Sequence, residues 1–236
     1  MRRLLVLWDI DYTLVNAGGV GTELYTRVFT SLYGRPLPQP GSMAGRTDRA
    51  IAREVLALAG LDGRDGLDQE LQLFQAALND TAPAFAARAR QVVTALPGAG
   101  AALEGLAALA TGQGPVQSLL TGNIRPMAEI KLAAVGLTRH LDLEVGSYGD
   151  LHEIRAELVA PARDAAAAAY DEDFGGTATV LIGDTPLDVA AALATGARAV
   201  GVATGHFSAA DLAAAGAHAV LPDLTDTAAV VSAILG

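Results

Sequence analysis

The segment LLVLWDIDYT (residues 4–13) decides the fold class of this chain. It joins a short apolar run, Leu4 to Trp8, to two carboxylates, Asp9 and Asp11. An apolar run without alternation is typical of a strand that is buried on both faces, as in a parallel sheet. Ligands of open α/β sheets bind beyond the carboxyl ends of the strands, so the two aspartates lie where a site is expected. On an extended strand the side chains of Asp9 and Asp11 would point to the same face, and we expect a turn to begin here.

Similar apolar runs recur along the rest of the chain, with helical patterns between them. The predicted strands are residues 4–8, 116–120, 141–145, 179–182, 199–202 and 219–221. The predicted helices after the first strand are residues 99–110, 126–135, 154–172, 186–194, 209–215 and 227–235. This alternation predicts an α/β fold with a doubly wound, mainly parallel sheet.

One region breaks the alternation. Residues 19–95 show several helical patterns and no good strand, with a proline-containing loop at 34–45 and a turn between helices at 60–63. We therefore predict a core domain, residues 1–15 and 96–236, with an inserted α-helical cap over residues 16–95. An ordinary helical subdomain without contact to a ligand is the alternative.

The composition limits the classes of partner. The 236 residues include 26 acidic and 16 basic ones, a formal net charge of −10, which argues against nucleic acid but not against a small phosphorylated ligand. With no cysteine, the chain has no disulfide framework, thiolate nucleophile or zinc–sulfur site. The apolar run at 4–8 is too short for a secretory signal, and no stretch resembles a membrane span. We expect no membrane partner and a cytoplasmic setting, while the oligomeric state stays open.

A second strand end carries carboxylates in the segment TVLIGDTPLD (residues 179–188). If Asp184 and Asp188 meet Asp9 and Asp11 at one sheet edge, the four groups repel one another unless a cation is present. Oxygen ligands of this kind select Mg²⁺ rather than zinc. Capping of the following helix is the alternative for Asp184 and Asp188.

A third strand end, in VQSLLTGN (residues 116–123), supplies a hydroxyl, a glycine and a helix start. Thr121, Gly122 and Asn123 therefore form a candidate substrate-binding loop, where backbone N–H groups could hold a phosphate at the helix N-terminus. An ordinary loop and helix cap is the alternative reading of these residues.

The order D-x-D-x-T, strand-end threonine and G-D-x-x-x-D resembles the haloacid dehalogenase-like (HAD) superfamily over essentially the whole chain. The place and helical character of the insertion resemble its C1-cap branch, which includes phosphoglycolate phosphatase-like and β-phosphoglucomutase-like proteins. The resemblance implies a Rossmann-like core. It also implies an enzyme, a Mg²⁺-dependent phosphomonoester hydrolase that acts on a small phosphorylated metabolite through an aspartyl-phosphate.

The resemblance also implies roles for single residues. Asp9 would be the nucleophile, and Asp11 the general acid and then the general base. Mg²⁺ would bind Asp9, the backbone carbonyl of Asp11 and Asp184, with Asp188 as a further or indirect ligand. Thr121 would hold a phosphoryl oxygen.

The basic residue of the family pattern has two candidates here. The usual Lys-Pro is absent from the corresponding segment HEIRAELV (residues 152–159), which offers Arg155. The other candidate is Lys131, the single lysine of the chain, which lies early in a predicted helix. An exposed position on a helix is the alternative for both residues.

The insertion carries the segment GRTD (residues 45–48) before a predicted helix. Cap loops of this branch contact the leaving group, so Arg46 is a candidate substrate-binding residue. A solvated arginine is the alternative for Arg46, and either Thr47 or Asp48 could cap the helix.

Other activities remain open to different degrees. A β-phosphoglucomutase-like enzyme shares the two aspartates and is the main alternative, followed by a catalytically silent binding module. The presence of Asp11 disfavours dehalogenase chemistry, and the insertion contains no lysine for phosphonatase chemistry. A dinucleotide site is excluded because the first strand leads into Asp9 rather than into a G-x-G-x-x-G turn.

Overall fold

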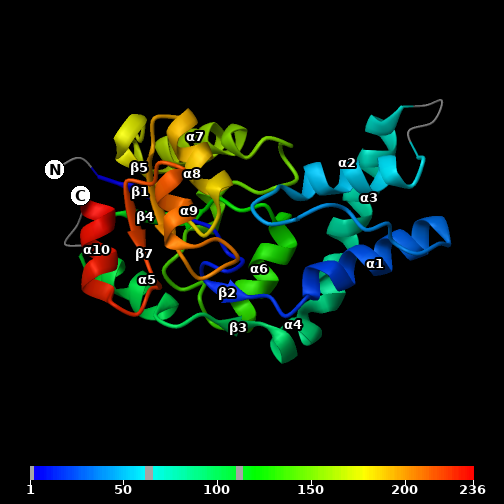
Figure 1. The fold of residues 1–236 in the computed structure, drawn as a ribbon, viewed down its shortest axis with the longest axis horizontal. Helices are drawn as coiled ribbons and strands as arrows, with labels where there is room; N and C mark the ends of the chain where they lie inside the picture. Colours follow the sequence, from blue (N-terminus) through cyan, green and yellow to red (C-terminus); the bar gives the residue numbers. More distant parts are fainter. Residues whose placement is uncertain (1–2, 62–65, 110–113) are drawn as a thin grey trace.

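The strands of the core form one parallel sheet in the computed structural model, which describes residues 3–61, 66–109 and 114–236 (Figure 1). The strand order is β4 (Val116–Leu119), β1 (Leu5–Trp8), β5 (Thr179–Gly183), β6 (Arg198–Val202) and β7 (Ala219–Leu221). All four neighbouring pairs are parallel. The predicted α/β fold class is confirmed, and five of the six predicted strands are present.

Helices cover both faces of the sheet because its strands are apolar on both sides. Leu5 and Leu7 belong to one buried cluster, while Val6 and Trp8 belong to the other. The Val6 face is covered by α5 (Ala99–Ala108), α6 (Arg125–Ala134) and α10 (Thr227–Leu235). The Leu5 face is covered by α7 (Val159–Tyr170), α8 (Pro186–Ala194) and α9 (Ala209–Ala214). The sheet is therefore doubly wound, as predicted.

The predicted strand at 141–145 is wrong. Asp142 N donates to Gln117 O at 2.8 Å beside β4, but the Asp142 side chain then accepts from Glu144 N. This side-chain bond turns the backbone into the 3₁₀ turn η2 (Leu143–Val145). The predicted helix at 154–172 likewise starts as a 3₁₀ turn, η3 (Arg155–Leu158), before α7.

A helical region follows β1 in the chain and lies beside the sheet (Figure 1). It consists of α1 (Val20–Tyr33), α2 (Asp48–Leu58), α3 (Leu67–Thr81), the 3₁₀ turn η1 (Ala82–Phe85) and α4 (Ala86–Val92). The chain enters it through β2 (Val15–Asn16) and leaves it through β3 (Thr94–Ala95), which pair antiparallel. The sequence pattern predicted neither of these short strands, and β3 lies in the range where no good strand was expected. Residues 62–63 of the predicted turn and residue 110 of the first predicted core helix lie outside the described residues.

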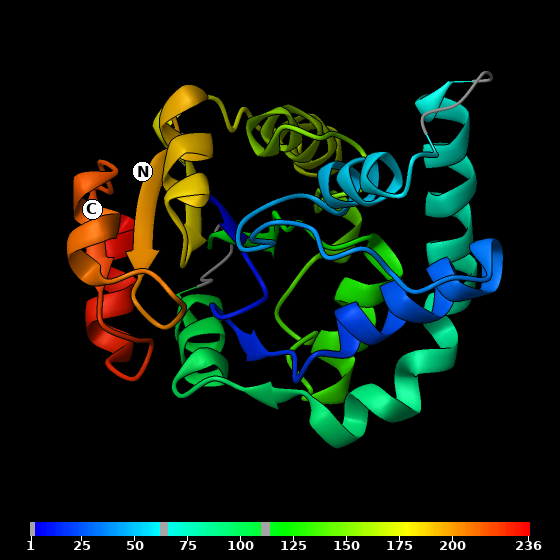
Figure 2. The same cartoon turned by 45° about the vertical axis from the view of Figure 1, so that its right-hand side comes forward.

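The segment between α1 and α2 reaches back to the sheet (Figure 2). Asp48 N donates to Gly122 O at 2.7 Å, and Arg49 N donates to Gly149 O at 2.8 Å. The helical region is thus hydrogen-bonded to loops at the carboxyl ends of the strands. None of the helices within the described ranges is both long and apolar enough to cross a membrane.

Gly98, where the chain returns to the core, tests this packing. Its φ is +82°, and a Cβ at this position would lie 2.0 Å from Leu224 O. We expect Gly98→Ala to lower the free energy of unfolding by roughly 2–4 kcal/mol, because left-handed strain and a backbone clash act together. Urea unfolding followed by circular dichroism measures this change.

Gly100→Ala is the matched control. Gly100 lies inside α5, and a Cβ there would meet Leu137 Cδ2 at 3.6 Å, an ordinary contact. Alanine should leave stability unchanged or raise it by up to about 1 kcal/mol. Equal changes in the free energy of unfolding for the two substitutions would contradict the close packing of Gly98 against Leu224.

Candidate active site

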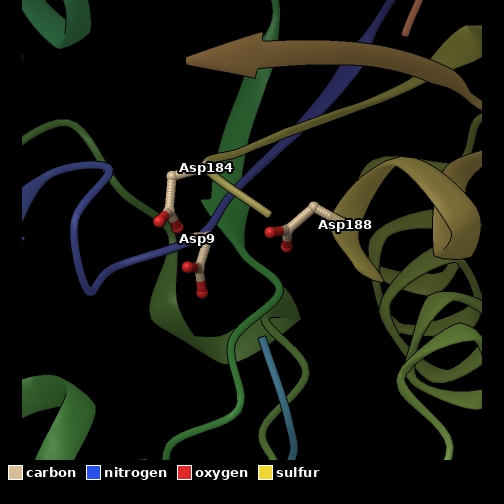
Figure 3. A group of neighbouring side chains, drawn as sticks. All are labelled: Asp9, Asp184 and Asp188. Atoms are coloured by element: carbon tan, nitrogen blue, oxygen red, sulfur yellow. The ribbon is translucent and has the colours of Figure 1, made fainter. Parts of the chain in front are cut away.

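Three buried carboxylates meet at the carboxyl end of the sheet (Figure 3). Asp9 follows β1, Asp184 follows β5, and Asp188 lies in the first turn of α8. One oxygen of each lies within 4.8 Å of the others. The strand order explains this meeting, because β1 and β5 are hydrogen-bonded neighbours.

Arg155 is the cation of this cluster. Its Nη2 donates to Asp9 Oδ1 at 2.7 Å and to Leu120 O at 3.0 Å, and it lies 2.7 Å from Asp188 Oδ1. Burial alone lowers the pKa of the guanidinium, but the charges of Asp188 and Asp9 outweigh it and hold that pKa above its usual range. Arg155 is buried and charged, so the alternative of an exposed helix start is wrong.

One guanidinium does not balance three carboxylates. Burial raises the pKa of Asp9, with Arg155 opposing the shift. Burial, together with the charges of Asp9 and Asp188, raises the pKa of Asp184. The cluster therefore favours a further positive charge, supplied by protons or by a cation.

The donor set fits Mg²⁺. All three side chains offer carboxylate oxygens, the ligands that Mg²⁺ prefers. The backbone at Gly205 lies close against Asp184, because a Cβ there would lie 1.8 Å from Asp184 Oδ2, so a larger side chain at this position would fill the space beside the carboxylate.

Asp188 has a second, structural use. Its Oδ2 accepts from Thr185 N at 3.0 Å, while Asp188 N donates to Thr185 Oγ1 at 3.3 Å, and these two bonds make the capping box of α8. The capping alternative therefore holds for Asp188. It does not hold for Asp184, because Thr185 is the N-cap residue.

A second group of side chains surrounds Asp11. Lys131 Nζ lies 2.8 and 2.7 Å from the two oxygens of Asp11 and donates to Asn123 Oδ1 at 2.6 Å. Asn123 Nδ2 donates to Asp11 Oδ2 at 2.8 Å. Lys131 is only 3% exposed, so its alternative as a surface residue is wrong as well. The two basic candidates contact different aspartates.

The separation of Asp9 from Asp11 results from the predicted turn. Tyr12 adopts a left-handed conformation with φ of +57°. Leu14 N and Val15 N both donate to Ile10 O, at 2.9 and 3.0 Å, so the chain leaves β1 immediately after Asp9.

A cavity of about 480 Å³ brings these groups together with the helical region. Of the predicted site residues, it is lined by Asp9, Asp11, Arg46, Gly122, Asn123, Lys131, Arg155 and Asp184. Thr121 and Asp188 are buried, and neither is among the described residues that line the cavity. The Thr121 hydroxyl accepts from Asn123 Nδ2 at 2.8 Å and so supports the loop.

Arg46 lines the cavity, but its guanidinium is bound within the helical region. Nη1 contacts the Glu54 carboxylate and Nη2 donates to Ala50 O at 3.3 Å. Thr47 is the residue that caps α2, since its side chain accepts from Ala50 N. Arg46 therefore reaches the cavity wall with its charge already paired.

Sequence reasoning missed several cavity residues. Asp48, considered only as a helix cap, instead accepts from Ile124 N at 2.8 Å and from Tyr25 Oη at 3.0 Å. Tyr25 carried no signal beyond its helical spacing. Tyr12 and His206 also line the cavity, with ring centroids 4.9 Å apart.

Comparison with known proteins places this arrangement in a class. The structure is an α/β fold with a doubly wound sheet, aspartates after β1 and β5, and a helical region beside the cavity. The family model described as haloacid dehalogenase-like hydrolase matches residues 6–193. The chain belongs to this family and is a hydrolase-family enzyme.

Solved structures show the same fold. A predicted phosphatase from Clostridium acetobutylicum is 17% identical, with a TM-score of 0.66 over 98% of this chain and 100% of that chain. A hydrolase from Pseudomonas syringae is 20% identical, with a TM-score of 0.65 over 98% of each chain. A predicted phosphoglycolate phosphatase from Haemophilus somnus is 16% identical, with a TM-score of 0.65 over 98% of this chain and 99% of that chain. No curated protein matches in sequence.

The contacts of Arg155 lead to a stability prediction. Arg155→Met leaves Asp9 and Asp188 buried without their cation, so we expect the free energy of unfolding in EDTA at neutral pH to fall by roughly 3–5 kcal/mol. Urea unfolding measures the difference.

Arg139→Met is the control for loss of an arginine. The Arg139 to Glu104 pair, at 3.3 Å, is exposed, so its removal should change stability by less than about 1 kcal/mol. If Arg155→Met is as stable as this control, Arg155 does not neutralise the buried cluster.

Proposed function

We propose that this enzyme is a Mg²⁺-dependent phosphomonoester hydrolase that acts on a small phosphorylated metabolite. The observation that carries the proposal is the pair of polar clusters on one cavity. Asp9, held by Arg155 at 2.7 Å, forms one cluster, and Asp11, held by Lys131 at 2.7 Å, forms the other. The proposed nucleophile, Asp9, and the proposed proton-transfer group, Asp11, are thus each held by a different cation.

The metal would be held by oxygen ligands. The carboxylates of Asp9 and Asp184 and the backbone carbonyl of Asp11 are the proposed ligands, with Asp188 supporting them through Arg155 and Thr185. When bound, Mg²⁺ offsets the negative charge on the phosphoryl oxygens.

Asp9 is the proposed nucleophile. Its carboxylate oxygen attacks phosphorus, the bond from phosphorus to the alcohol oxygen breaks, and an aspartyl-phosphate forms on Asp9. Arg155, bonded to the other side of this carboxylate, orients it. Arg155 is therefore our choice for the basic residue of the family pattern.

Asp11 is the proposed acid and base. Protonated, it gives its proton to the leaving alkoxide; ionised, it takes a proton from the water whose oxygen attacks the phosphorus. The bond from phosphorus to Asp9 then breaks, which releases phosphate and restores both aspartates. Lys131 and Asn123 position Asp11, since both donate to its carboxylate.

The loop after β4 is the proposed phosphoryl-binding element. Gly122 and Asn123 line the cavity just before α6, where backbone N–H groups favour an anion, and one of these groups, Ile124 N, already donates to Asp48. Thr121 is the proposed ligand of a phosphoryl oxygen in the family pattern, and its hydroxyl already bonds to Asn123.

Residues 16–95 are the proposed cap, and residues 1–15 with 96–236 the proposed core domain. The cavity has walls from both parts, and Gly45 O of the cap accepts from Arg155 Nη1 at 3.3 Å. A cap that closes in this way excludes bulk water from the aspartyl-phosphate until the reaction requires it.

The test is phosphate release from p-nitrophenyl phosphate, with Mg²⁺ or with EDTA. We expect release to require Mg²⁺ and Asp9→Asn to lower kcat by at least about 10³-fold, because the nucleophile is lost. Asp164→Asn, at an exposed position of α7, is the matched control and should retain wild-type activity. Undiminished release in EDTA, or by Asp9→Asn, would contradict the proposal.

A further inference from the structure

The helical region contributes one whole wall of the cavity. This wall, called here the distal wall, includes Leu24, Tyr25, Met43, Arg46, Asp48 and Ile51. The sheet side of the same cavity carries the groups that act on phosphorus. The distal wall therefore faces the part of a phosphomonoester that leaves as the alcohol.

The distal wall carries two charged residues, Arg46, which is paired with Glu54, and Asp48. The two carboxylate oxygens of Asp48 accept from Tyr25 Oη at 3.0 Å and from Ile124 N at 2.8 Å, both uncharged donors. No ion pair to Asp48 occurs within the described ranges. Burial raises the pKa of Asp48 to about 6, and nearby Lys131 opposes the shift, so the carboxylate is mainly ionised at neutral pH.

The cations that line the cavity are already paired. Among the described lining residues, Arg155 is bound to Asp9 and Lys131 to Asp11. Arg46 is bound to Glu54. His206 is exposed, and its ring packs at a tilt against Tyr12, with ring centroids 4.9 Å apart. A second anion on a bound phosphomonoester would thus meet the Asp48 carboxylate without a free guanidinium or ammonium group beside it.

The opposite holds for a neutral leaving group. An alcohol hydroxyl can donate to an Asp48 oxygen, which has lone pairs beyond those used by Tyr25 and Ile124. A carboxylate or second phosphate in the same place is repelled, and the low dielectric of a buried site strengthens the repulsion.

We infer that the substrate is a phosphomonoester of a neutral, hydroxyl-bearing alcohol, and that Asp48 excludes esters with a second anionic group. This inference rests on the proposed hydrolase function and narrows it. It also disfavours the phosphosugar mutase, because transfer of the phosphoryl group back to a sugar phosphate passes through a bisphosphate. The second phosphate of that bisphosphate would meet the distal wall.

Two matched pairs of esters test the inference. 2-Hydroxyethyl phosphate and 2-phosphoglycolate have the same length and differ in a hydroxymethyl group against a carboxylate. Glycerol 3-phosphate and 3-phosphoglycerate differ in the same way. With Mg²⁺ at neutral pH, we expect kcat/KM for the neutral ester to exceed that for the anionic ester by about tenfold or more in at least one pair. In neither pair should the anionic ester have the higher kcat/KM.

Asp48→Asn tests whether this residue causes the preference. The substitution removes the charge at nearly constant shape, so kcat/KM for the anionic esters should rise and the preference should shrink several-fold. Asp48→Glu is the matched control: it keeps a carboxylate at this position, so the preference for the neutral esters should persist.

The outcomes separate the inference from the function on which it rests. Loss of all activity, including that on p-nitrophenyl phosphate, would overturn the proposed hydrolase. Activity on p-nitrophenyl phosphate without a preference for either neutral ester would overturn the inference alone. If Asp48→Asn does not fold, the wild-type preferences still decide whether the substrate class is correct. An unchanged preference in folded Asp48→Asn would overturn the role of Asp48.

Discussion

The contact of Arg155 with Asp9 and Asp188 is the interaction on which the site depends. A parallel sheet brings the ends of β1 and β5 together, and this places Asp9 and Asp184 side by side in the interior. Like charges so close are unfavourable, and a guanidinium 2.7 Å from two of the three carboxylates reduces the repulsion. The negative charge that remains is what makes the cluster receptive to a divalent cation.

The sequence predicts most of the sheet because its signals are local. Apolar runs followed by aspartate or threonine identify the strand ends at Asp9, Thr121 and Asp184. The prediction of a strand at 141–145 was wrong because the carboxylate of Asp142 caps a 3₁₀ turn, a contact that hydropathy does not reveal.

The two basic candidates could not be ranked from sequence because their partners are remote. Arg155 and Lys131 lie 146 and 120 positions from the aspartates that they contact. Asp48 was missed for a similar reason: its local position is typical of a helix cap, while its partner Ile124 is 76 positions away. Residues at the carboxyl end of the sheet and residues of the helical region thus meet only in the folded chain.

The central claim is that the Asp9 carboxylate attacks phosphorus and carries the phosphoryl group during turnover, and a direct chemical trap tests it. An acyl phosphate is reduced by borohydride to an alcohol, which converts the aspartate that carries it into homoserine. Wild-type protein, quenched during turnover, reduced and digested, should show homoserine at position 9 by mass spectrometry. Steady turnover with Asp9 unmodified, or with homoserine at another position, would contradict the account.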